Sequence, residues 1–206
     1  MDYSIKFWNR IADSYAKKPI SDEVSYQQKL TITQQYLHPE MNVLEFGCGT
    51  GSTAIVHAPY VKEYQAIDVS PKMIEIAQRK QTAATIDNLT FINAAIEELP
   101  VADESLDAVL GMSILHLLND RDEAIGEVYR MLKPGGVFIS STACLADTMP
   151  YIRYIAPVGR FLRLIPKVGV FSRQELQAGL VKSGFRIEKI LVAEKNKTVC
   201  FLVAIK

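Results

Sequence analysis

The sequence predicts an α/β fold in which helices cover both faces of a mostly parallel sheet, and three observations support it. From residue 41 onward, short apolar runs alternate with helical patterns, as in strands joined by crossover helices. The last two apolar runs, at 187–192 and 198–205, are joined by a connection of hairpin length, which makes that pair antiparallel. The length of 206 residues and the hydrophobic content of 49% suit one globular domain. We therefore expect a single domain over residues 1–206, with a three-layer, doubly wound, seven-stranded sheet and one antiparallel edge strand.

The first 40 residues are expected to form two helices. Apolar residues recur every three or four positions over residues 5–15 and again over 26–37, a spacing typical of helices that bury one face. Pro19 separates the two because proline cannot continue a helix. Ser21 is suited to cap the second helix, and Pro39 is expected to end it.

Five apolar runs predict the strands that precede the final hairpin. They occupy residues 41–46, 64–69, 89–93, 106–112 and 137–142. Ser70-Pro71 opens a helix after the second run, Asn119-Asp120 opens one after the fourth, and Ser172 with Glu175 predicts a capping box. Residues 143–171 break the alternation and are expected to form an insertion.

A glycine-rich loop follows the first strand, where ligands of open α/β sheets bind. Its sequence, Gly-Cys-Gly-Thr-Gly at 47–51, permits a tight turn and a close approach of a ligand to the backbone. Asp68 ends the second strand 21 residues after Gly47, a spacing at which a carboxylate accepts hydrogen bonds from ribose hydroxyls. The third glycine, Gly51, comes one residue too early for a dinucleotide-binding loop, so we expect a ligand with a ribose and no pyrophosphate.

These motifs resemble those of class I S-adenosylmethionine-dependent methyltransferases, of the type 11 branch that includes ubiquinone and menaquinone biosynthesis enzymes. Residues 43–51 are similar to the first motif of that family, and later motifs match in order at 66–73, 97–100, 105–109 and 132–136. The resemblance implies a Rossmann-like fold and an enzyme that transfers the methyl group of S-adenosylmethionine to a small organic acceptor, by O- or C-methylation, and releases S-adenosylhomocysteine.

The resemblance also implies which residues bind the cofactor. Asp68 would hold the ribose, and Val69 and Met73 would contact the adenine, although a doubly wound fold would bury those two side chains in any case. Ala95 stands where the family usually has an aspartate for the adenine amino group, which leaves the backbone amide of Ile96 for the ring. The expected cofactor-binding residues are Tyr15, Glu45, Gly47, Cys48, Gly49, Gly51, Asp68, Val69, Met73, Ala95, Ile96 and Met112.

Two segments outside these motifs are implied to close over the site. Residues 1–40 would act as a helical lid through Trp8 and Tyr15, with simple helix packing as the alternative. Residues 143–171 would cap the acceptor pocket, and the stretch 148–174 contains five basic residues and no acidic one. A solvated basic face or a membrane-surface helix are the alternatives for that stretch. The candidate acceptor-binding residues are Tyr151, Arg153, Tyr154, Arg160 and Arg163.

His116 is the candidate catalytic residue, because a histidine after the fourth strand is placed to remove a proton from the acceptor. Its alternative role is a hydrogen bond to the backbone at the start of a helix. Two other functions remain open for the whole chain. One is a non-catalytic S-adenosylmethionine-binding protein, and the other, disfavoured by the glycine spacing, is a nicotinamide-dependent oxidoreductase.

Composition and motifs also exclude several partners. Basic and acidic residues balance at 23 each, and the Asn/Asp-Pro-Pro-aromatic motif of nucleic-acid amino methyltransferases is missing, so we expect no nucleic-acid substrate. The end of the fifth strand, Ser140-Ser141-Thr142, lacks carboxylates for Mg²⁺, so we expect no metal. Three scattered cysteines predict a cytoplasmic protein, and the lack of a long apolar run predicts no stable membrane insertion. A monomer or a homodimer is expected, and the sequence does not choose between them.

Overall fold

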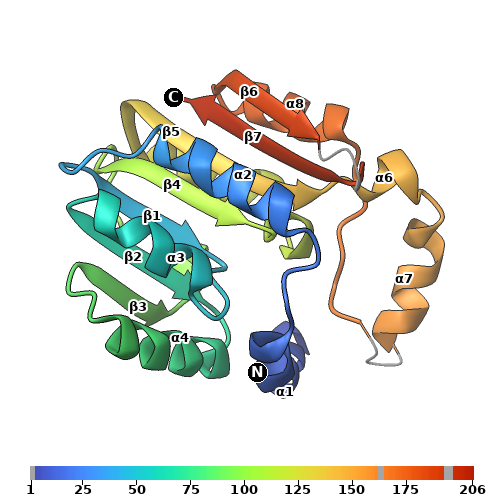
Figure 1. The fold of residues 1–206 in the computed structure, drawn as a ribbon. Helices are drawn as coiled ribbons and strands as arrows, with labels where there is room; N and C mark the ends of the chain where they lie inside the picture. The colour runs from blue at the N-terminus through green and yellow to red at the C-terminus, as the bar shows by residue number, and fades with distance from the viewer. Residues whose placement is uncertain (1–2, 162–164, 193–196) are drawn as a thin grey trace.

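The computed structural model describes residues 3–161, 165–192 and 197–206, and it is built around one sheet of seven strands in the order β3-β2-β1-β4-β5-β7-β6 (Figure 1). The strands are β1 (Asn42–Phe46), β2 (Glu63–Asp68), β3 (Leu89–Asn93), β4 (Leu106–Met112), β5 (Leu132–Ala143), β6 (Arg186–Val192) and β7 (Val199–Ile205). The first five run parallel, and β7 pairs antiparallel with both β5 and β6. The predicted fold class is confirmed, and the reversed strand, β7, lies between β5 and the edge strand β6.

Helices cover both faces of this sheet, and others lie beside it (Figure 1). The α-helices are α1 (Tyr3–Lys17), α2 (Glu23–Gln34), α3 (Ser52–His57), α4 (Pro71–Ala84), α5 (Arg121–Met131), α6 (Leu145–Thr148), α7 (Ile152–Phe161) and α8 (Arg173–Lys182). One core cluster joins α5 and α8 to the sheet, and a second joins α2, α3 and α4 to its other face. Because side chains alternate along a strand, Leu44 and Phe46 of β1 point to the first cluster, while Val43 and Glu45 point to the α2–α4 side.

Most helix starts follow the predicted caps. The Ser70 hydroxyl accepts a hydrogen bond from the Met73 amide at 3.2 Å, and Ser172 forms a capping box with Glu175. The prediction for the second helix is wrong by one residue, because Asp22 and not Ser21 is its cap. The helix begins at Glu23, so residue 22 occupies the cap position, and the Asp22 carboxylate accepts from the Ser25 amide at 3.1 Å.

Two predicted boundaries also shift. The second helix ends at Gln34, several residues before Pro39, because a turn follows directly and brings Leu37 into the core. Strand β5 begins at Leu132 and not at residue 137, because Leu132 already pairs with Leu106 before an irregularity in the ladder.

The N-terminal helix α1 lies outside the sheet, beyond the carboxyl ends of the strands, and packs on α4 (Figure 1). Ala12 of α1 forms a small cluster with Met73 and Ile76 of α4. The Ser70 hydroxyl also donates to Asn9 Oδ1 at 2.7 Å. These contacts fix α1 above the ends of the central strands.

Candidate functional site

The three glycines of the loop after β1 all have positive φ, between 55° and 74°, a backbone region that side chains other than glycine rarely adopt. A Cβ on Gly47 would lie 2.5 Å from Ile114 Cγ1, and one on Gly51 would lie 2.5 Å from Phe91 Cζ. At Gly49 the nearest atom outside the loop is Tyr15 Cε1, at 3.9 Å. Gly47 and Gly51 therefore allow close packing, whereas Gly49 leaves room for a ligand.

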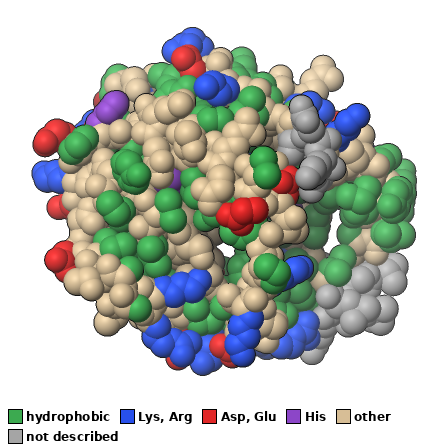
Figure 2. All heavy atoms as spheres, viewed as in Figure 1, with side chains coloured by type: hydrophobic (Ala, Val, Ile, Leu, Met, Phe, Trp, Pro, Cys, Tyr) green, Lys and Arg blue, Asp and Glu red, His purple; other side chains and the backbone are tan. Residues whose placement is uncertain are grey.

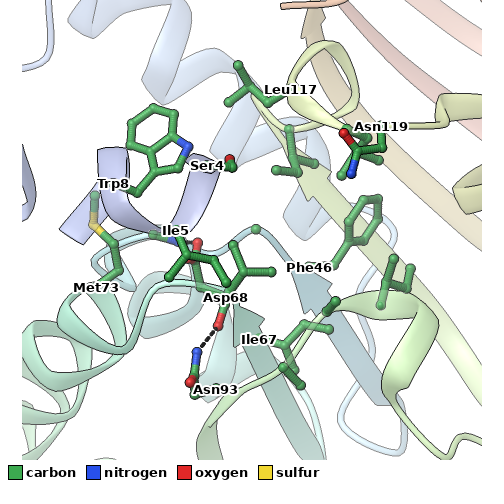
Figure 3. Close-up of a pocket in the computed structure, with 18 of the residues that line it drawn as sticks. Ser4, Ile5, Trp8, Phe46, Ile67, Asp68, Met73, Asn93, Leu117 and Asn119 are labelled. Carbon is green, nitrogen blue, oxygen red and sulfur yellow. Dashed lines mark hydrogen bonds between the residues drawn. The ribbon is translucent and has the colours of Figure 1, made fainter. Parts of the chain in front are cut away.

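Asp68 closes the loop from the end of β2. Its two carboxylate oxygens accept hydrogen bonds from the amides of Gly49 at 2.9 Å and Ser70 at 2.8 Å. Burial raises the pKa of Asp68, and these two hydrogen bonds oppose that shift. A carboxylate can accept about four hydrogen bonds, so about two positions remain for a ligand. The Asn93 side chain donates to the Asp68 backbone carbonyl at 2.7 Å and joins the ends of β2 and β3 (Figure 3).

A cavity of about 460 Å³, called the α1 cavity, lies between α1 and the strand ends. In Figure 3, Ser4, Ile5 and Trp8 of α1 face Asp68 and Asn93 across it. The predicted cofactor-binding residues that line it are Tyr15, Gly47, Gly49, Asp68, Val69, Met73, Ala95, Ile96 and Met112. The sequence therefore identified its loop side and missed Ser4, Ile5 and Asn93.

A second cavity of about 450 Å³, called the α2 cavity, lies between α2, α3 and the ends of β1 and β5. Glu45 and Cys48 line it, and it shares the following residues with the α1 cavity: Tyr15, Gly47, Gly49, Met112 and Ser113. Among the twelve predicted cofactor-binding residues, only Gly51 lines neither cavity. The two cavities thus meet at the glycine loop and the end of β4.

Glu45 is buried, with 1% of its surface exposed, and its carboxylate accepts a hydrogen bond from the Tyr64 hydroxyl at 2.8 Å. Burial raises the pKa of Glu45 to about 8, and the hydrogen bond from Tyr64 only partly offsets this. The carboxyl is therefore uncharged at neutral pH, and a cation placed beside it would favour the ionised form.

Ser113, at the junction of the cavities, has φ of 60°, an uncommon value for a residue other than glycine. Its amide donates to the Ser141 carbonyl at 2.6 Å, which ties the end of β4 to β5. Such backbone strain concentrates at functional sites. Sequence reasoning missed Ser113 because no residue pattern marks a serine for this conformation.

His116 lies beside the end of β5. Its Nδ1 is 3.1 Å from Thr142 Oγ1 and accepts from the Ala143 amide at 3.4 Å. Burial lowers the pKa of His116 to about 4. In the described part of the chain His116 lines neither cavity, so its position matches the backbone-bonded alternative more closely than the catalytic one.

The described candidate acceptor-binding residues, Tyr151, Arg153 and Tyr154, line neither cavity. Tyr151, directly before α7, and Tyr154, on α7, are exposed at 57% and 78%, and Arg153 is exposed beside them. Arg163 and the side chain of Arg160 lie outside the described residues. The surface is hollowed between the body of the molecule and the segment that bears α7 (Figure 2). Among the described residues of the predicted cap, Lys167 alone lines the α1 cavity, and its ammonium donates to Asn119 Oδ1 at 3.0 Å.

Over the described ranges, the side chains of His, Cys, Asp and Glu form no cluster of three that could hold a metal. Cys48, Cys144 and Cys200 are free and buried. None of the described helices is long and apolar enough to cross a membrane.

Comparisons with known proteins agree with this architecture. A methyltransferase domain family matches residues 44–140. The chain is 32% identical over 157 residues to the demethylmenaquinone methyltransferase of Lactiplantibacillus plantarum. This match covers 71% of this chain and 63% of that protein. It is 30% identical over 105 residues to the malonyl-[acyl-carrier protein] O-methyltransferase of Serratia marcescens, over 51% of this chain and 39% of that protein. The chain thus spans less than two thirds of the length of both relatives.

A crystal structure of an S-adenosylmethionine-dependent methyltransferase from Thermotoga maritima superposes on the chain with a TM-score of 0.71. The two are 22% identical, and the match covers 98% of this chain and 99% of the other, which shows a shared fold. The ordered motifs, the family match and the sheet topology lead to one conclusion. The chain contains a match to the methyltransferase domain family at residues 44–140, and it has the fold of S-adenosylmethionine-dependent methyltransferases.

Proposed function

We propose that this chain transfers a methyl group from S-adenosylmethionine to a small organic acceptor. The observation that carries the proposal is the meeting of two cavities at the glycine loop, with Asp68 on one side and the carboxyl group of Glu45 on the other. This arrangement suits a long ligand with a nucleoside at one end and a charged amino-acid group at the other.

The residues present fit that cofactor. Asp68 keeps lone pairs free for ribose hydroxyls, and Val69, Met73 and Ile96 offer apolar surface for a purine in the α1 cavity. Ala95 provides no hydrogen-bond acceptor for the adenine amino group, although the neighbouring Glu97 also lines this cavity. Glu45, in the α2 cavity, is suited to a cationic group, because a cation would stabilise its ionised form.

When bound, S-adenosylmethionine supplies a methyl group already activated by its positive sulfur. The work of this chain is then to align the acceptor and exclude water, which can contribute on the order of 7 to 11 kcal/mol. Met112 and Ser113, at the junction of the cavities, are the residues that we expect to face the reacting groups. We propose that α1, within the 1–40 segment, is the lid over the donor and that the 143–171 segment borders the acceptor.

We propose that the acceptor is methylated either on oxygen or on carbon. The named relatives include an O-methyltransferase and a demethylmenaquinone methyltransferase, and they do not decide between the two. His116 is the candidate base, but its hydrogen bonds at Nδ1 and its lowered pKa favour the alternative, backbone-bonded role, which we propose for it. The three buried free thiols suit a reducing compartment, and we propose the cytoplasm.

Calorimetry with S-adenosylhomocysteine tests the proposal directly. We expect one-to-one binding to the wild-type protein, and we expect Asp68→Ala to weaken it by roughly 1.5 to 3 kcal/mol, the value of hydrogen bonds to a charged group. Part of that loss would come from the loop, because Asp68 also holds Gly49. Tight binding of a nicotinamide cofactor without binding of S-adenosylhomocysteine would contradict the proposal.

Transfer of a labelled methyl group to any acceptor in a panel of phenols, quinols and carboxylic acids separates an enzyme from a non-catalytic binding protein. We expect transfer with at least one acceptor.

A further inference from the structure

Lys29 is a half-buried cation in the α2 cavity. Its ammonium donates a hydrogen bond to Ser141 Oγ at 3.0 Å, from α2 to the end of β5. Within the described residues no carboxylate lies at ion-pair distance from it, whereas Lys72 and Lys133 meet carboxylates at 2.9 Å and 2.6 Å. Burial lowers the pKa of Lys29, and the negative charge of Asp22 opposes this shift but has the smaller effect.

The same cavity contains buried polar atoms without partners. Thr33 Oγ1 and both ring nitrogens of His57 have no hydrogen-bond partner among the described residues, and neither side chain is exposed. Both residues line the α2 cavity. Thr33 lies one helical turn after Lys29, so the two share a face of α2. Buried polar groups are normally satisfied, so the wall of the α2 cavity combines a cation without a counter-ion and polar atoms that the described residues leave without partners.

A partly buried ammonium that meets only a serine hydroxyl has lost hydration without gaining a counter-ion, which is unfavourable. A carboxylate in the cavity would supply that counter-ion through charge-assisted hydrogen bonds. We propose that Lys29 binds a carboxylate of a ligand in the α2 cavity and that Ser141 positions its ammonium. The inference rests on the proposed function, which offers two sources for that carboxylate: the amino-acid end of the methyl donor, or an acidic group on the acceptor.

Two titrations distinguish the sources, each with wild-type protein and Lys29→Met. The first compares S-adenosylhomocysteine with its decarboxylated analogue. The second adds benzoate or the neutral benzamide to protein saturated with S-adenosylhomocysteine. The measured quantity is the ratio of the affinity for the ligand with the carboxylate to that for its analogue without it. If the carboxylate comes from the donor, this ratio should fall about tenfold or more in Lys29→Met in the first titration. If it comes from the acceptor, the ratio should fall by the same factor in the second titration.

Lys62→Met is the matched control, because Lys62 is exposed and lines neither cavity. It should keep both preferences. Thermal unfolding without ligand adds a second readout, because replacing a lysine that only stabilises the fold would lower the Tm. If Lys29 is kept for a ligand, Lys29→Met should be at least as stable as the wild type without ligand, since it removes an uncompensated charge. Lys29→Gln, which keeps a donor for Ser141, serves if the methionine variant does not fold.

Unchanged carboxylate preference in both titrations with Lys29→Met or Lys29→Gln would overturn the inference while leaving the proposed function intact. A wild-type protein that does not bind S-adenosylhomocysteine would overturn the proposed function and this inference with it.

Discussion

At the scale of single residues, the burial of Glu45 predicts that its protonation changes when the ligand binds. Because its pKa is raised to about 8, the free protein carries a protonated carboxyl there at pH 7. A ligand ammonium beside it would lower that pKa, so we expect S-adenosylhomocysteine binding to release a proton. Calorimetry at pH 7 in phosphate and in Tris should then give different binding enthalpies, and Glu45→Gln should remove the difference. Identical enthalpies for the wild type in both buffers would contradict this assignment.

His116 offers a second test at this scale. Its Nδ1 is engaged with Thr142 and Ala143, and a pKa of about 4 makes it a weak base at neutral pH. We therefore expect His116→Asn, whose amide oxygen can still accept from Ala143, to lower kcat by less than about tenfold. A general base would contribute roughly 10²- to 10⁴-fold. A loss in that range, with stability unchanged, would restore the catalytic role.

The sequence predicted the residues at the glycine loop and missed those that helix α2 contributes to the α2 cavity. Gly49 and Asp68 could be predicted because their spacing along the chain is itself the signal. The role of Lys29 could not be predicted, because its partner Ser141 lies 112 residues away in the sequence. Within its own helix, Lys29 looks like an ordinary exposed lysine. The α2 cavity, in which Lys29 can meet a ligand, forms only when α2, α3 and the strands pack together.

At the scale of elements, α1 is held by a small interface. Ala12 packs on α4, Asn9 accepts from Ser70, and Tyr3, Trp8 and Tyr15 line the α1 cavity. Deletion of residues 1–18 should therefore lower affinity for S-adenosylhomocysteine by about tenfold or more while circular dichroism still reports a folded sheet, because both main core clusters exclude α1. Equal affinity of the truncated protein would show that α1 is packing and not a lid.

Elements with a clear period or cap were predicted within a few residues, as Ser70 and Ser172 illustrate. Helices α6 and α7 were not predicted, because residues 143–171 mix proline, aromatic and basic residues without a regular spacing. The composition of that segment suggested an acceptor cap. The structure instead directs Tyr151 and Tyr154 outward, and no local pattern encodes that direction.

At the scale of the whole molecule, the two core clusters share one sheet, so ligand binding at the strand ends should stabilise the protein as a unit. Free S-adenosylhomocysteine at about 100 times its Kd should add about 2.7 kcal/mol to the free energy of unfolding. For a chain of 206 residues this corresponds to a rise in Tm of about 5 to 10 °C. Differential scanning calorimetry would measure it, with Asp68→Ala at the same ligand concentration as control. No rise in the wild type would exclude binding at this site.

Tyr3 of α1 donates a hydrogen bond to the Ile165 carbonyl at 2.9 Å, and shortly beyond it the Gly169 amide donates to the His116 carbonyl at 2.7 Å. The first helix and the segment that leads to α8 are thus bonded to each other, and Tyr3 and Lys167, one from each, line the α1 cavity. A molecule that fills this cavity contacts both segments. We therefore expect the rate at which a product dissociates to depend on both segments together.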